Sequence, residues 1–232
     1  MRSVPRSELA GLGLIALCAL LLEVNLTRIF SVTLWYYFGV LAISLALPGT
    51  AAAGVSCSLY PRPLIDDRHY SNYLIGSSAL FAIFTPVAIY AHLALDLASH
   101  PFSHLGFYLM LGVELLLLVV AFFFAGLCIA IMLFRYHAEV GKVYCADLLG
   151  ASLGSVLFMA LIHQFSAPAI TFAISTGGCL AAYAFSRRRK APHVRTLLGL
   201  LAAVFLALFL GNDRSAWLRI GSIKSIRPDY AQ

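Results

Sequence analysis

Charge is the scarcest property of this sequence. Only 11% of its 232 residues are charged and 61% are hydrophobic, whereas soluble domains average about 25% charged and about 45–50% apolar residues. The composition therefore predicts an integral membrane protein. The net charge of +6 comes from basic residues in short segments between apolar runs. Such residues orient a chain in the bilayer and attract lipid headgroups, so the charge does not predict nucleic-acid binding.

Motifs of soluble metal and nucleotide chemistry are also missing. The five cysteines form no CxxC pair and mostly lie in apolar runs, which predicts buried free thiols rather than disulfides or a zinc cluster. The sequence contains no GxxxxGK[ST], HExxH or GxSxG motif, and no GxGxxG follows a strand. These absences exclude a nucleotide site of the soluble type. They leave no visible catalytic residue, so whether the chain is an enzyme stays open.

Long apolar runs dominate what is present. A membrane-spanning helix needs about 20 apolar residues, and no alternating pattern typical of a barrel competes with this interpretation. We predict an all-α, polytopic bundle of about seven helices in a domain of residues 1–211, with a polar tail or linker at 212–232. The predicted spans are 9–30, 34–59, 73–97, 105–134, 144–164, 169–185 and 196–210. Pro48 and Pro86 predict kinks in the second and third spans.

Basic residues favour one orientation. They gather before the first span and after the second, fourth and sixth spans, and cytoplasmic loops carry such an excess. The N-terminus is therefore predicted to lie in the cytoplasm. Seven spans would then place the tail outside, although the tail carries four more basic residues. The sequence does not resolve this conflict.

Glutamates lie within the first and fourth predicted spans. Glu114 lies ten residues into the fourth span, near the bilayer centre, where an unpaired charge costs at least about 2.5–3.5 kcal/mol. It is predicted to be protonated or paired, either as a structural hydrogen bond or in a proton or substrate role. Glu23, Thr27 and Arg28 close the first span. They form either a local polar cap with a snorkelling arginine, or an inward-facing charge that meets a substrate or another helix.

Histidines and one aspartate recur every four residues at the end of the third span. His92, Asp96 and His100 would share one face of a continuous helix, with His104 next in the series, and such a face can hold a metal ion. His163 could join them from the same side of the membrane. Pro101 interrupts the pattern because the residue before a proline leaves the helical region. Histidines of an interfacial loop are the simpler interpretation, so we predict no metal or other cofactor in this chain.

Residues 142–154, KVYCADLLGASLG, combine a carboxylate with small residues. Asp147 is predicted near the N-terminus of the fifth helix, where the helix dipole favours an acid, in a salt-bridged cap with Glu139 and Lys142. Gly150 and Gly154, together with Ala151, predict a small-residue face that lets a second helix approach closely in lipid.

Three segments together resemble the membrane domain of bacterial multi-pass spermidine synthase-like proteins. They are LLEVNLTRIFSV (21–32), YYFGVLAISLALPGTAAAG (36–54) and VYCADLLGASLG (143–154), within a resemblance that spans residues 10–165. The matched residues are Glu23, Leu26, Thr27, Arg28, Phe30 and Ser31, then Tyr37, Phe38, Ser44, Ala46, Gly49 and Gly54, then Tyr144, Asp147, Leu148, Gly150, Ala151 and Gly154.

The resemblance implies a bacterial inner membrane and a soluble partner domain. In that family, a helical membrane region is joined to an aminopropyltransferase-like domain with a methyltransferase fold, which would bind an S-adenosylmethionine-type ligand. This sequence ends at Gln232, about where such a domain would begin. The family's catalytic residues therefore have no counterparts here. We expect a membrane-only relative, one half of a split system, or part of a longer protein.

The leading functional hypothesis is a membrane domain that anchors or scaffolds a soluble protein and binds a small substrate between the first, second and fifth helices. Glu23, Arg28 and Asp147 would be its polar anchors. One alternative is a proton- or cation-coupled carrier, for instance of polyamines, built on Glu114. A second alternative is a structural subunit of a larger membrane complex.

Overall fold

The computed structural model describes residues 4–33, 39–60, 69–95, 105–187 and 192–215. Within them it contains seven long helices, one short 3-10 helix and no strand, which confirms the predicted all-α fold. Each long helix has the length and apolar composition to cross a membrane. The elements are α1 (Arg6–Thr33), α2 (Gly39–Leu59), α4 (Tyr70–Leu95), α5 (Leu105–Arg135), η3 (His137–Glu139), α6 (Val140–Ile162), α7 (Ala167–Ser186) and α8 (Pro192–Ser215).

All seven predicted spans coincide with these helices, and the differences lie at the ends. Helix α6 begins four residues before the predicted start, and α8 is longer than predicted at both ends. Residues 34–38 of the second predicted span and 216–232 of the predicted tail lie outside the described residues. Pro48 and Pro86 both lie inside helices that continue through them.

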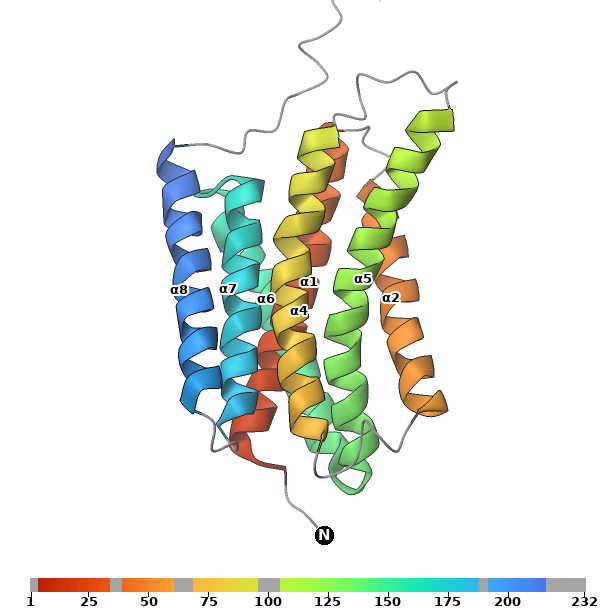
Figure 1. Cartoon of the computed structure of the whole chain (residues 1–232), viewed down its shortest axis with the longest axis vertical. Coiled ribbons are helices and arrows are strands. Elements are labelled where there is room, and N and C mark those ends of the chain that lie inside the picture. The colour runs from red at the N-terminus through yellow and green to blue at the C-terminus, as the bar shows by residue number, and fades with distance from the viewer. Residues whose placement is uncertain (1–3, 34–38, 61–68, 96–104, 188–191, 216–232) are drawn as a thin grey trace, which may run out of the picture.

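Helix α1 lies at the centre of the bundle. Figure 1 shows α8, α7, α4, α5 and α2 side by side across the front, with α1 and α6 behind them. Helix α1 packs directly against α2, α5, α6 and α7. Its buried side chains, such as Leu22, Leu26 and Phe30, join one hydrophobic core with Phe81 of α4 and Phe122 of α5. The core is thus arranged around the first helix of the chain.

Helices α1 and α6 run parallel and touch backbone to backbone. A Cβ atom at Gly154 would lie 2.6 Å from the carbonyl oxygen of Leu17, and one at Gly150 would overlap the backbone of Gly13. Ala151 lies half-buried beside Gly150. Only residues without a side chain permit this approach, which is how helices pack closely in lipid.

The outer surface of the bundle is largely apolar. Helices α2, α6 and α8 each turn large hydrophobic side chains outward. Examples are Leu47 on α2, Val156 and Met159 on α6, and Leu197 and Leu200 on α8. Soluble monomers rarely expose so much continuous apolar surface. This outer face suits the hydrocarbon of a lipid bilayer.

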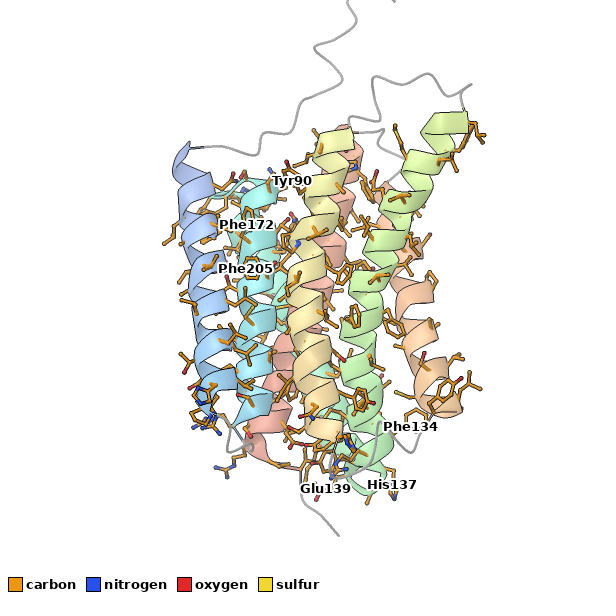
Figure 2. The ribbon with its side chains drawn as sticks, viewed as in Figure 1. Tyr90, Phe134, His137, Glu139, Phe172 and Phe205 are labelled. Atoms are coloured by element: carbon orange, nitrogen blue, oxygen red, sulfur yellow. The ribbon has the colours of Figure 1, made fainter. Side chains whose placement is uncertain are left out.

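Because the seven described long helices cross the bundle an odd number of times, α1 begins at one end and α8 finishes at the other. The N-terminus lies at one end, which also carries the turn from α5 to α6, and α8 ends at the other (Figure 1). Figure 2 shows His137 and Glu139 at the first end and Tyr90 near the second. We call them the N-terminal end and the opposite end. A cytoplasmic N-terminal end stays a prediction.

The contact between α1 and α6 yields a first prediction. Gly150→Ala should destabilise the protein by about 1–3 kcal/mol, because the new methyl group meets the Gly13 backbone rather than a movable side chain. The measurement is the midpoint of thermal unfolding of the purified protein in detergent.

The matched control lies on the same helix. A Cβ atom at Gly141 would meet nothing within 4 Å, so Gly141→Ala should be neutral or stabilising by up to about 1 kcal/mol. Equal midpoints for the two variants would contradict the close contact.

Candidate functional site

A buried contact between a histidine and a glutamate joins α4 to α5 near the opposite end. His92 Nδ1 lies 2.6 Å from Glu114 Oε1, and His92 Nε2 lies 2.7 Å from the hydroxyl oxygen of Thr33 on α1. The exposed fractions are 0% for Glu114 and 4% for His92. The ring of Phe30 packs edge-on against the imidazole, with centroids 5.2 Å apart. Three helices therefore meet at one histidine.

The partners of Glu114 lie near helix ends, since Thr33 is the last residue of α1 and His92 stands three residues before the end of α4. Figure 1 shows the start of α5 a little beyond these ends. The contact therefore lies toward the opposite end of the bundle, and a position of Glu114 near the bilayer centre stays a prediction. The carboxylate is paired, as a buried acid requires.

A second buried carboxylate lies at the N-terminal end. Glu8 accepts hydrogen bonds from the hydroxyl groups of Tyr70 and Tyr136, the latter at 2.7 Å, and its exposed fraction is 1%. The guanidinium of Arg135 lies over the Tyr70 ring, 3.9 Å from its centroid, a favourable cation–π geometry. These contacts tie the start of α1 to the start of α4 and the end of α5.

Tyr136 stands in the turn between α5 and α6. Its burial raises the pKa of the phenol, and the hydrogen bond to the Glu8 carboxylate raises it further. The phenol therefore stays protonated and keeps donating to the acid. Sequence reasoning missed this cluster, whose only signal was an acid directly before the first predicted span.

An amide on α1 reaches α7. Asn25 Nδ2 donates to the carbonyl oxygen of Ala167 at 3.0 Å and to the Thr171 hydroxyl at 3.1 Å. Asn25 is fully buried, so these bonds replace the water that lipid cannot supply. They hold the start of α7 against the middle of α1.

The three polar residues predicted at the end of the first span do not act together but have different contacts. Arg28 Nη1 donates to the carbonyl oxygen of Ile162, the last residue of α6, at 3.3 Å. Thr27 donates to the Val24 carbonyl on its own helix. Glu23 is half-buried and makes no hydrogen bond or ion pair with any other described residue. Arg28 thus meets another helix, whereas a substrate contact by Glu23 stays a prediction.

Asp147 does not belong to a helix cap. Helix α6 begins at Val140, so Asp147 lies two turns inside it. Glu139 and Lys142 pair without it, at 3.1 Å, although the Glu139 side chain makes no capping hydrogen bond to the helix. Glu139 also accepts a hydrogen bond from the Val4 amide at 3.0 Å, which links the start of α6 to the N-terminal segment. The predicted dipole contact of Asp147 is therefore wrong.

The Asp147 side chain has no polar partner within the described residues. It is half-buried, and no hydrogen bond or ion pair links it to another described side chain or backbone group. Its neighbours along α6, Tyr144 and Leu148, are exposed. An acid at the edge of an apolar helix face is thus available to a molecule outside the chain.

The predicted metal ligands are only partly described. Asp96, His100 and His104 lie outside the described residues. His92 uses both ring nitrogens on Glu114 and Thr33, and His163 follows the end of α6. Within the described part of the chain, no three His, Cys, Asp or Glu side chains come together as metal ligands.

All five cysteines carry free thiols, as predicted, although Cys145 is exposed.

Comparisons with known proteins complete these observations. Neither a family model, nor a curated protein, nor a solved structure matches this chain.

The Glu8 cluster yields a second prediction. Tyr136→Phe removes one donor from a buried carboxylate, which should cost about 1–3 kcal/mol of stability. The measurement is again the thermal unfolding midpoint in detergent. Tyr144→Phe is the matched control, because Tyr144 is exposed and should change stability by less than about 0.5 kcal/mol. A Tyr136→Phe midpoint as high as that of Tyr144→Phe would refute the assignment.

Proposed function

We propose that this chain is the membrane domain of a spermidine synthase-like system and holds a soluble, aminopropyltransferase-like protein or domain at the bilayer. The resemblance rests on segments that fall on α1, α2 and α6. Helix α1 packs against both of the others, so the three segments form one contiguous part of the bundle. Such contiguity is what a shared functional surface requires.

The observation that carries the proposal is the unpaired Asp147. A half-buried carboxylate without a polar partner on its own chain is unfavourable, and a basic group of another protein would satisfy it. The bare outer face of α6 around it offers apolar area for the same contact. In this proposal Asp147 is the anchor for the partner, and Gly150, Ala151 and Gly154 fix α6 on α1.

The partner would contact the N-terminal end of the bundle. Asp147 lies about 10 Å along α6 from Val140 at 1.5 Å per residue. The α5–α6 turn beside it presents the exposed residue His137 (Figure 2), and Lys142 is exposed in the first turn of α6. A soluble protein can therefore reach both the turn and the first turns of α6. The proposed cytoplasmic side of this end agrees with the use of an S-adenosylmethionine-type ligand by the partner.

Substrate chemistry is assigned to the partner rather than to this chain. The proposal gives Glu23 and Arg28 a role in holding a small substrate where α1, α2 and α6 meet. No catalytic step is assigned to a residue of this chain.

The test is intact mass spectrometry of the complex purified from its native membrane. The proposal expects a stoichiometric chain with an aminopropyltransferase or methyltransferase fold, or a longer species that carries such a domain. A lone chain of 25.2 kDa, or one found only among unrelated membrane subunits, would contradict it. The latter result would favour a structural subunit of a larger complex.

A third prediction concerns Asp147 directly. Asp147→Lys should abolish co-purification of the soluble partner, and Asp147→Asn should weaken it about tenfold, which corresponds to about 1.4 kcal/mol. Both variants should remain monodisperse in size-exclusion chromatography, because no contact within the described chain depends on the carboxylate. Full retention of the partner by Asp147→Lys would end this assignment.

A second candidate function is a cation-coupled carrier, and the buried His92–Glu114 pair favours it. Ionisable residues inside membrane domains often mark ion or proton pathways. Uptake of a cation into proteoliposomes that is lost in Glu114→Gln would support this candidate. Absence of uptake for every cation tested would count against it.

A further inference from the structure

The hydroxyl group of Thr33 fixes the proton on one side of His92. Thr33 Oγ1 donates its single hydrogen to the carbonyl oxygen of Ile29 at 2.8 Å. The same oxygen lies 2.7 Å from His92 Nε2. Because that hydrogen is already used, the oxygen can only accept from the imidazole. His92 Nε2 therefore carries a proton.

One further proton is shared across the contact with Glu114. His92 Nδ1 and Glu114 Oε1 lie 2.6 Å apart, a distance that requires a hydrogen between them. The proton belongs either to the imidazole, which gives His⁺ and Glu⁻, or to the carboxyl group, which gives two neutral groups. Both arrangements have the same net charge of zero. The pair is thus a single protonation site rather than two.

Loss of the shared proton leaves a buried negative charge. The pair would then consist of a neutral imidazole and a carboxylate with an exposed fraction of 0%. An unpaired ion at such a position costs several kcal/mol. Only a cation that takes the place of the proton restores neutrality.

The second carboxylate oxygen is available to such a cation. Glu114 Oε2 is buried and has no hydrogen-bond partner among the described residues. Deprotonation frees Glu114 Oε1 and His92 Nδ1 as acceptors, in addition to Oε2. Carboxylate oxygens and a ring nitrogen suit a small metal cation or the N–H groups of a primary ammonium.

Other described charged groups do not substitute for the cation. On α1, Arg28 is bonded to α6, Glu23 is itself acidic, and Glu8 lies about 37 Å from Thr33 at 1.5 Å per residue. Tyr90 and Tyr108, the tyrosines of α4 and α5 at this end, are exposed.

Within the described residues, the helices packed against α1, α4 and α5 add no nearby charge. Helices α2 and α7 contain no charged residue. Lys142 and Asp147 lie in the first half of α6, and Arg135 ends α5, so all three belong to the N-terminal end. Asp96, His100 and His104 lie outside the described residues.

We propose that His92 and Glu114 form a one-proton site that releases its proton in exchange for one small monovalent cation bound by the Glu114 carboxylate. The shared proton passes to water, the cation takes its place, and the net charge stays zero. The site lies about 5 Å from the end of α4 at 1.5 Å per residue.

The test uses the full chain, purified in detergent without buffer, with a pH indicator present. Addition of sodium, potassium or methylammonium chloride should release about one proton per chain at saturation. The metal salts and methylammonium separate a metal site from an ammonium site. Choline chloride is the control, because its quaternary ammonium has no N–H donor and is too large for the site.

Competition supplies a second readout on the unaltered protein. The apparent dissociation constant of the active cation should rise about tenfold for each pH unit by which the solution is acidified, since one proton competes with one cation. Glu114→Gln keeps the side-chain size but has no proton to exchange, so it should release none. Glu8→Gln alters the distant carboxylate and should release as many protons as the wild type.

Three results would overturn the proposal. They are no proton release by any of the three cations at neutral pH or one unit above, equal release by choline, or undiminished release from Glu114→Gln. If Glu114→Gln does not fold, the competition measurement decides, and an affinity that does not change with pH refutes the exchange.

The exchange site adds a mechanism to the second candidate function, a cation-coupled carrier. The site itself does not depend on transport. Proton release in detergent without uptake into proteoliposomes would retain the exchange site and reject the carrier. Uptake without proton release would retain the carrier and reject the exchange site.

Discussion

In a lipid bilayer, a buried polar side chain has no water to bond and must find its partner on a neighbouring helix. Helix α1 carries four polar side chains, two buried and two half-buried, that each tie it to other elements. Glu8 binds the tyrosines of α4 and the α5–α6 turn, Asn25 binds α7, Arg28 binds the end of α6, and Thr33 binds His92 of α4. These bonds fix both the depth and the rotation of α1, and the other helices pack around it.

The same need for polar partners identifies the two regions to which we assign functions. At the N-terminal end, Glu8 is satisfied by donors on other helices, whereas Asp147 has no partner among the described residues. At the opposite end, Glu114 satisfies one oxygen and leaves the other without a described partner. Natural structures keep few buried polar atoms unsatisfied. An outside molecule at Asp147 and a small cation at Glu114 would each complete an arrangement that the chain leaves incomplete.

Hydropathy predicted the helices well because lipid requires each span to be long, apolar and internally hydrogen-bonded. It misplaced Asp147, because α6 begins at Val140, four residues before the apolar run that hydropathy detects. His92 and Glu114 were both identified from the sequence, but not as a pair. Glu8 was missed for a related reason, since its partners lie 62 and 128 residues away. Pairings at such separations follow from the packing of the helices and cannot be read from one sequence.

The role of α1 as the polar centre of the bundle is tested most directly by a double-mutant cycle between Asn25 and Thr171. The measured quantity is the unfolding free energy in mixed micelles for Asn25→Leu, Thr171→Val and the double variant. A direct bond between α1 and α7 predicts a coupling energy of about 0.6–1.7 kcal/mol, the range for hydrogen bonds between membrane helices. Single-variant effects that add with no coupling would contradict the arrangement of α1 against α7.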